Sequence, residues 1–302
     1  MIDNFCFGYW PEEIGFESQY LQVSVAENFS ALTRDINASE HDDVRNGWIY
    51  APHLSRIFGL HHTHSMSVKL DGMPEISKLG SKGIQEYVEF NLWVLSLFKG
   101  IKLTNTERGY LDATPIRINE LNDFIIKNGN IPMLLDLAHS FFKANLSSRQ
   151  SLRFNAAVNA YFISQNPQLL QYEKFIYLYY AIDTCYKICS ELPGFSSVKP
   201  DKPVLHKERL TILCSLYNIN PPEWMLNNEL DVVGLRNNAM HEAIYLEKPL
   251  GYAVHSDKQI NLILELKNLV CRFLVAIITN NKTSYIQSPV NTRRCMSLNL
   301  QI

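Results

Sequence analysis

The segment from Ser148 to Thr279 most constrains the fold, because its apolar residues recur at helical intervals between proline-containing stops. Asn166-Pro167 and Pro193-Gly194 end two such stretches, and Pro221-Pro222 opens another. The pattern predicts helices over 148–164, 171–191, 207–217, from Pro222 through the sequence that holds Arg236 and His241, and over 257–279. Since the connections are short or medium in length, we expect these helices to pack antiparallel in a bundle.

The chain before this segment has a mixed pattern. Short strands are predicted at 5–10, 20–25, 48–50 and 67–70, with a polar loop at 37–46. Helical periodicity runs from Ile84 to Gly100, Pro132 opens a helix over 133–142, and 118–126 fits either a short helix or a strand. The sequence therefore predicts an α+β protein. It has a mixed α/β N-terminal domain over 1–145, an all-α antiparallel helical bundle over 146–282 and a C-terminal tail over 283–302.

The composition narrows the classes of function. With 46% hydrophobic and 19% charged residues, the chain has the composition of a soluble globular protein. A net charge of −2 argues against broad, sequence-blind coating of nucleic acid but permits a local basic site. The N-terminus lacks the pattern of a signal peptide, and charged residues interrupt the longest apolar run, 260–278. We therefore expect a cytoplasmic protein that does not span a membrane.

Two groups of residues raise the question of a metal site. The six cysteines lie mostly inside apolar runs without metal-type spacing, which favours reduced core thiols: Cys6, Cys185, Cys189, Cys214, Cys271 and Cys295. His61, His62 and His64 lie close together, but no cysteine or suitably spaced acidic residue completes a coordination shell. His62 and His64 would share a face only in a strand. We expect a surface or interface loop with no metal and no cofactor; a metal-dependent hydrolase centred on these histidines is the alternative.

The residues from Gly234 to Glu242 carry the clearest chemical signal. On a regular helix, at about 100° per residue, Asn237 and His241 share a face, and Arg236 lies about 140° around from His241. Histidine titrates near neutrality, and arginine offers a fixed cationic fork for phosphate. The pair therefore suits proton transfer at a ribose hydroxyl with stabilisation of charge on the phosphate. A packed histidine beside a solvated arginine is the structural alternative.

This motif, its position and the helix count resemble the HEPN superfamily, in particular its ApeA-like group. HEPN domains are helical bundles defined by an arginine, four to six further residues and a histidine, usually with a polar residue directly after the arginine. Arg236, Asn237 and His241 match that pattern in what we predict to be the penultimate long helix. Asp183 aligns with a position at which relatives carry an acidic residue. The resemblance covers residues 146–282.

The resemblance implies a metal-independent endoribonuclease that leaves 2′,3′-cyclic phosphate and 5′-hydroxyl ends. It would act as a homodimer through the HEPN domain, where each arginine could serve the partner's site. His241 would be the general base or acid at the 2′-hydroxyl, Arg236 would hold the scissile phosphate, and Asn237 would orient the histidine or the phosphate. Since ApeA-like members carry a variable N-terminal module, we expect a toxin or anti-phage defence effector that its N-terminal domain regulates in response to a phage or host trigger.

RNA is the expected substrate because its 2′-hydroxyl supplies the nucleophile. Candidate substrate-binding residues are Asp183, Lys207, Arg209 and Lys248, although the three cations could equally be solvated surface charges. Some HEPN toxins paired with nucleotidyltransferase antitoxins carry a tyrosine two residues after the histidine, where this chain has Ala243. That difference argues against regulation by tyrosine modification. The alternative function is a non-catalytic HEPN-type binding or dimerisation module.

Overall fold

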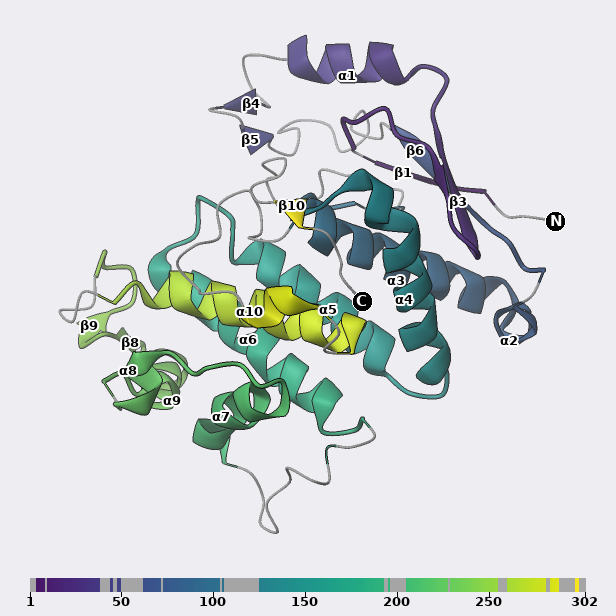
Figure 1. Cartoon of the computed structure of the whole chain (residues 1–302). Coiled ribbons are helices and arrows are strands. Elements are labelled where there is room, and N and C mark those ends of the chain that lie inside the picture. The colour runs from purple at the N-terminus through teal and green to yellow at the C-terminus, as the bar shows by residue number, and fades with distance from the viewer. Residues whose placement is uncertain are drawn as a thin grey trace. The chain divides into compact units, whose positions relative to one another are not determined.

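The computed structural model describes most of the chain, and its structure is mixed α+β and rich in helix (Figure 1). The described residues are 4–8, 10–38, 44–45, 48–49, 62–71, 73–103, 105, 125–192, 195, 205–227, 229–254, 260–280, 283–287 and 297–298. Two compact units make up the chain: unit 1 is Met1–Asn155 with Arg294–Leu300, and unit 2 is Ala156–Arg293 with Gln301–Ile302. The α+β class is therefore confirmed. The division falls within helix α5 (Gln150–Ile163), beyond the predicted boundary at 145.

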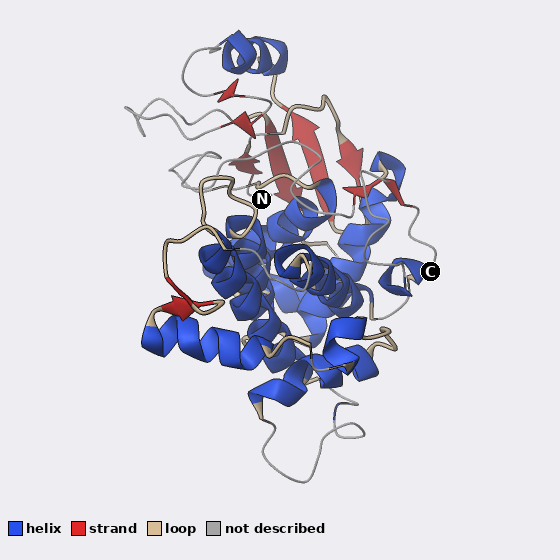
Figure 2. Ribbon diagram, turned by 90° about the vertical axis from the view of Figure 1, so that its left-hand side faces the viewer, coloured by secondary structure: helices blue, strands red, loops and turns tan. Residues whose placement is uncertain are grey.

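Unit 1 contains a four-stranded antiparallel sheet in the order β1–β6–β3–β2, whose strands lie side by side in Figure 2. The strands are β1 (Asn4–Phe7), β6 (His64–Val68), β3 (Leu21–Val25) and β2 (Phe16–Glu17). Alternate residues of β3 and β6 are buried, because successive side chains of a strand point to opposite faces. The smaller pairs are antiparallel β4 (Val44–Arg45) with β5 (Trp48–Ile49), and parallel β7 (Ile125–Ile126) with β10 (Ser297–Leu298).

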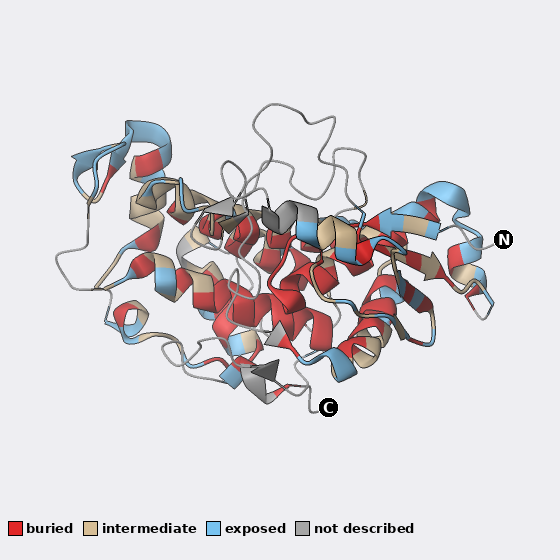
Figure 3. Ribbon diagram, turned by 90° about the horizontal axis from the view of Figure 1, so that it is seen from above, coloured by how far each residue is buried: buried red, intermediate tan, exposed pale blue. Residues whose placement is uncertain are grey.

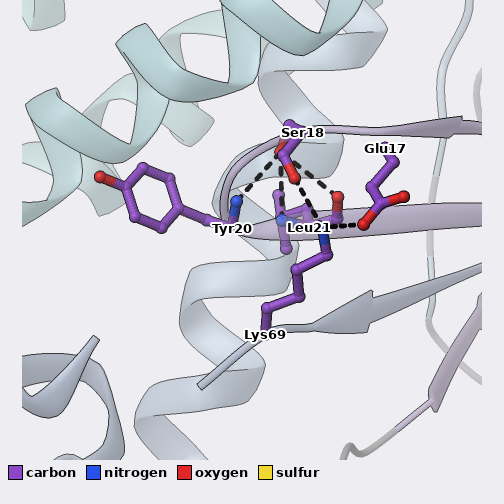
Figure 4. A network of polar contacts seen from close by, with 5 residues as sticks. All are labelled: Glu17, Ser18, Tyr20, Leu21 and Lys69. Atoms are coloured by element: carbon purple, nitrogen blue, oxygen red, sulfur yellow. Dashed lines mark hydrogen bonds and ion pairs between the residues drawn. The ribbon is translucent and has the colours of Figure 1, made fainter. Parts of the chain in front are cut away.

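A polar network holds the turn between β2 and β3 (Figure 4). The Ser18 hydroxyl accepts hydrogen bonds from the backbone N–H groups of Tyr20 (3.3 Å) and Leu21 (3.1 Å). The Lys69 ammonium pairs with Glu17 and donates to the Ser18 carbonyl at 2.8 Å. The Tyr20 ring at this turn stacks on His139, with 3.7 Å between the ring centroids.

The helices of unit 1 bury a continuous aromatic cluster. They are α1 (Phe29–Ala38), α2 (Pro74–Ser77), α3 (Gly80–Lys99), the 3₁₀ turn η1 (Asn128–Asn130) and α4 (Ile131–Ala144), followed by the start of α5. Phe90 of α3 contacts Phe141, Phe142 and Phe154, with ring centroids 5.4–5.8 Å apart. Helix α3 ends at Gly100, whose φ of 63° is a left-handed conformation that glycine adopts without a Cβ penalty.

Unit 2 is helical apart from one small hairpin. Its elements are the rest of α5, α6 (Gln171–Cys189), α7 (His206–Leu216), α8 (Glu223–Leu226), α9 (Val232–Asn237), the π-helical turn η3 (Asn238–Glu242), β8 (Ile244–Tyr245), β9 (Lys248–Pro249), α10 (Leu262–Thr279) and the 3₁₀ turn η4 (Ser284–Gln287). Helices α6 and α10 lie against each other (Figure 1). Nearly every residue of α10 from Leu266 onward is buried, so α10 is the central helix of this unit. Figure 3 shows the burial of each residue: buried positions run along the helices, and many exposed positions lie at turns and helix ends.

Several predicted elements are confirmed, with shifted ends. Helices α5, α6 and α7 match the predictions over 148–164, 171–191 and 207–217, and α3 and α4 match those in unit 1. The last helix begins later than predicted, at Leu262, because the Asn261 side chain accepts the Leu264 N–H and caps it there. Helix α1 ends inside the predicted polar loop 37–46 and is absent from the sequence-based assignment.

The fourth predicted helix is wrong, because it is two separate helices. Helix α8 stops at Leu226, and α9 starts only after Asp231. The Asp231 carboxylate accepts the Gly234 N–H at 2.9 Å, which begins a new helix. Asparagine and aspartate compete with helical backbone hydrogen bonds and so favour such breaks. The motif therefore lies in a short helix and not in a long one.

Two further expectations concern the membrane and the cysteines. In the part of the chain that the structure describes, no helix is both long and apolar enough to cross a bilayer. The thiols of Cys185, Cys189, Cys214 and Cys271 are free and buried, as predicted, whereas Cys6 is free and exposed. Cys295 lies outside the described residues.

Candidate functional site

Arg236 and His241 lie on one helical segment that changes geometry between them. Arg236 belongs to α9, and His241 to the π-helical turn η3, at the end of which Ala243 donates its N–H to the Asn238 carbonyl five residues earlier. A π-turn holds more residues than an α-turn, so each residue advances by less than 100°. The angle between Arg236 and His241 about the helix axis is therefore smaller than the 140° predicted for a regular α-helix.

The Arg236 guanidinium has two partners. It donates to the Asn237 side-chain oxygen at 2.9 Å and lies 5.9 Å from the centre of the Tyr179 ring of α6. A guanidinium over an aromatic face gains electrostatic and packing energy. The structure thus brings two of the three predicted catalytic residues, Arg236 and Asn237, into direct contact and anchors α9 on α6.

His241 lies at the exposed end of the segment. Within the described residues, it makes no hydrogen bond or ion pair. Its neighbour Met240 is 45% exposed, and the Met240 sulfur lies 4.0 Å from the hydroxyl of Tyr180, which is itself 43% exposed. Tyr177 contacts Tyr180 edge to face. His241 is therefore accessible and has exposed aromatic surface nearby, which suits stacking of an unpaired base.

A second cluster joins α6 to α7. Asp183 forms an ion pair with Arg209, 2.8 Å between Oδ1 and the guanidinium, and its Oδ2 lies 3.6 Å from His206 Nδ1. His206 Nδ1 also lies 3.2 Å from the Tyr179 hydroxyl. Two predicted substrate-binding residues, Asp183 and Arg209, therefore contact each other, and Tyr179 links them to Arg236.

Charge around Tyr179 is balanced between both signs. Burial raises the pKa of Tyr179 to about 12, and Asp183 and Asp231 add to that rise while Arg236 and Arg209 oppose it. The hydroxyl therefore stays protonated at neutral pH and is available for hydrogen bonding to His206. Its ring remains a neutral surface under the Arg236 guanidinium.

A cavity of about 380 Å³ opens beside this cluster, between α6, α7, α8 and the start of α9. Its lining combines an apolar floor with aromatic and charged groups: Tyr179, Ile182, Asp183, His206, Arg209, Leu210, Thr211, Trp224, Met225, Leu230, Asp231, Val232 and Val233. Trp224 is held in the wall by its indole N–H, 3.4 Å from a Glu265 carboxylate oxygen of α10. This volume lies within the range of small-molecule sites, and such a mixed lining is typical of them.

The remaining predicted substrate-binding residues lie apart from this cluster or cannot be placed. Lys248 is exposed on β9 and has no ion-pair partner within the described residues. Its hairpin is fixed to α6 by Tyr245, whose ring is buried 5.5 Å from that of Phe175. Lys207 belongs to α7, but its side chain lies outside the described part of the structure.

His206 and Tyr179 are site residues that sequence analysis did not single out. A signal for His206 was present, because it directly precedes the helix predicted from 207. A helix that began one residue earlier would place His206 and Arg209 on one face. Tyr179 belongs to the aromatic-rich helix α6, and because rings at such density are usually core residues, the sequence does not distinguish it.

The histidines of unit 1 do not form the surface loop that we predicted. His64 is a buried residue of β6, 1% exposed, and its ring contacts Phe7, Trp10 and Phe29. Burial lowers the pKa of His64 to about 4. His62 is exposed, and His61 lies outside the described residues. Among the described residues, no group of three or more His, Cys, Asp or Glu side chains could hold a metal ion.

Comparison of the chain with known proteins identifies no relative: no family model, curated protein or solved structure matches it.

Proposed function

We propose that the chain is a metal-independent endoribonuclease of HEPN type, acting as a homodimer in a toxin or anti-phage defence role, with unit 1 regulating unit 2. The observation that carries the proposal is the π-helical turn, which brings His241 closer to the Arg236 side of the helix and leaves it exposed. π-turns inside helices occur frequently at functional sites. RNA cleavage needs proton transfer at the 2′-hydroxyl and a cation at the phosphate, and these two side chains supply both.

In this mechanism the 2′-oxygen attacks the adjacent phosphorus and the bond to the 5′-oxygen breaks, which leaves a 2′,3′-cyclic phosphate and a 5′-hydroxyl. His241 transfers one of the protons, and Arg236 binds the phosphate as its negative charge grows. Asn237 accepts a hydrogen bond from Arg236 and so orients the guanidinium. The exposed ring of Tyr180, which the partly buried Tyr177 contacts edge to face, offers stacking surface for an unpaired strand.

The test is cleavage of total cellular RNA by purified protein in EDTA, with the product ends mapped. We expect cleavage by the wild type, and losses of about 10²–10³-fold for Arg236→Ala and about 10²–10⁴-fold for His241→Ala. Arg149→Ala and His62→Ala are matched controls, because both residues are exposed and belong to unit 1. Equal cleavage by the wild type and both site variants would refute the site. Loss of cleavage in EDTA with recovery on adding a divalent cation would refute the metal-independent mechanism.

A non-catalytic binding or dimerisation module is the second candidate, because one observation favours it. Arg236 already has partners on its own chain, Asn237 and Tyr179, and these contacts could serve only to fix α9 on α6. In that case Arg236→Ala would lower the melting temperature, and the wild type would bind RNA or its own copy without cleaving RNA. Arg236→Lys separates the two roles, because lysine keeps the charge but lacks the planar fork that binds phosphate through two hydrogen bonds.

A further inference from the structure

Cleavage of RNA by this route needs two proton transfers, and His241 can perform only one of them in each step. One group must remove the proton from the 2′-hydroxyl, and another must give a proton to the departing 5′-oxygen. His206 is the other half-exposed histidine of unit 2 whose side chain is described, and it lines the cavity beside α9. It is linked to Arg236 through one residue, since both contact Tyr179.

The surroundings of His206 match those of a general base. Its Nδ1 faces the Asp183 carboxylate at 3.6 Å and the Tyr179 oxygen at 3.2 Å, which favours a proton on Nδ1 and a free lone pair on Nε2. Asp183 is itself fixed by Arg209 at 2.8 Å, so the imidazole is positioned by a group that is held in turn. The charged or titratable groups beside it are Asp183 and Tyr179 of α6 and Arg209 of α7, and Asp231 lines the same cavity.

Building on the proposed function, we propose that His206 is the general base of the reaction and His241 its general acid. His206 Nε2 takes the 2′-hydroxyl proton as the new O2′–P bond forms. His241 donates a proton to the 5′-oxygen as the P–O5′ bond breaks, so one proton is taken up and one released. Asp183 is a positioning residue, because it acts through His206.

The test uses two forms of one RNA substrate that differ at the leaving atom. In one form the bridging 5′-oxygen is replaced by sulfur, and the resulting thiolate leaves without protonation. The purified full-length wild type, His206→Gln, His241→Gln and Asp183→Asn are compared on both substrates, with His62→Gln as the matched control. Melting temperatures show whether each variant is folded.

We expect His206→Gln to lose about 10²–10⁴-fold on both substrates, because the base is needed for either leaving group. His241→Gln should lose as much on the oxygen substrate and regain its rate on the sulfur substrate. The wild-type cleavage rate should increase with pH on the acidic side of its pH profile. This increase should be absent in His206→Gln and should occur at a different pH in Asp183→Asn. Glutamine retains much of the size and polarity of histidine, so the loss can be separated from unfolding.

The other outcomes are decisive in different ways. Wild-type cleavage with full activity of His206→Gln would overturn this inference and leave the proposed function standing. Rescue of His206→Gln, but not of His241→Gln, by the sulfur substrate would reverse the two roles and also overturn it. No cleavage of either substrate by the wild type would overturn the proposed function, and this inference with it.

Discussion

His64 in unit 1 and His206 in unit 2 each have an oxygen close to Nδ1, but the rest of their surroundings differ. His64 has the Thr63 hydroxyl at 2.9 Å and aromatic rings around it, and it is 1% exposed. The His206 side chain is 40% exposed, faces a cavity and has the Asp183 carboxylate nearby. Dry aromatic surroundings hold an imidazole neutral, whereas a carboxylate and access to solvent allow it to exchange a proton. The surroundings of His64 make it a packed core residue, whereas those of His206 leave its ring accessible to solvent and to the cavity.

His139 extends the comparison within unit 1. Its ring is stacked on Tyr20 and lies 3.1 Å from the Tyr87 hydroxyl through Nδ1. Burial lowers the pKa of His139, the nearby Lys143 lowers it further, and Glu75 opposes the change. Two histidines of unit 1 are thus core residues with lowered pKa values.

The largest effect we predict concerns His64. Its pKa is about 4 in the folded chain and near 6.5 when unfolded, so the unfolded state binds more protons between these pH values. Stability is therefore complete above pH 6.5 and falls as the pH is lowered towards 4, by about 3 kcal/mol from this residue. Urea unfolding at pH 7 and pH 4.5 measures the difference, which should shrink in His64→Gln.

Met66→Leu is the matched control for that measurement, because Met66 is buried on the same strand and does not titrate. It should lower stability by a similar amount at both pH values. A pH dependence that survives in His64→Gln would show that other groups cause it.

The second prediction tests whether the polar cluster of unit 2 is more than a surface ion pair. A double-mutant cycle of Asp183→Ala and Arg209→Ala should give a coupling free energy of about 0.5–3 kcal/mol, because both side chains are largely shielded from solvent. The same cycle on Lys187 of α6 and Glu191 just beyond its end, an exposed pair at 3.0 Å, should give about 0.3–0.5 kcal/mol. Urea unfolding of each set measures both values, and a coupling no larger than that of the exposed pair would contradict the distinction.

Much of the helical framework could be predicted from sequence, because apolar periodicity and proline stops are local signals. Helices α5, α6 and α7 follow from them within a few residues. The break before α9 could not be predicted in the same way. Asp231 is an ordinary polar residue in the sequence, and only its hydrogen bond to the Gly234 N–H shows that a new helix starts there.

The candidate site was predictable only in part. Arg236, Asn237 and His241 are close in sequence, so a spacing argument finds them together. The contacts of Asp183 with Arg209 and His206 join two helices, and sequence periodicity carries no information about such pairing. His64 shows the opposite failure: three histidines in four residues predict a surface or interface loop, yet the sheet buries one of them.

The smallest predicted effect compares the ends of two helical segments. Helix α3 of unit 1 ends on Gly100 with φ 63°, and the π-turn of unit 2 ends on Ala243 with φ 55°. The left-handed region costs a residue with a Cβ about 1–2 kcal/mol, and part of that is offset because glycine is more flexible when unfolded. Ala243→Gly should therefore stabilise the chain by about 0.5–1 kcal/mol, and Gly100→Ala should destabilise it.

The same variant also tests whether the turn positions His241. Since glycine adopts this conformation readily, Ala243→Gly should leave the turn, and hence the position of His241, unchanged. Urea unfolding should therefore show the gain in stability while RNA cleavage stays at the wild-type rate. A gain in stability accompanied by slower cleavage would mean that the alanine methyl group, and not the turn alone, sets the position of His241. Lower stability would mean that the strain at Ala243 is smaller than the flexibility that glycine adds to the unfolded chain.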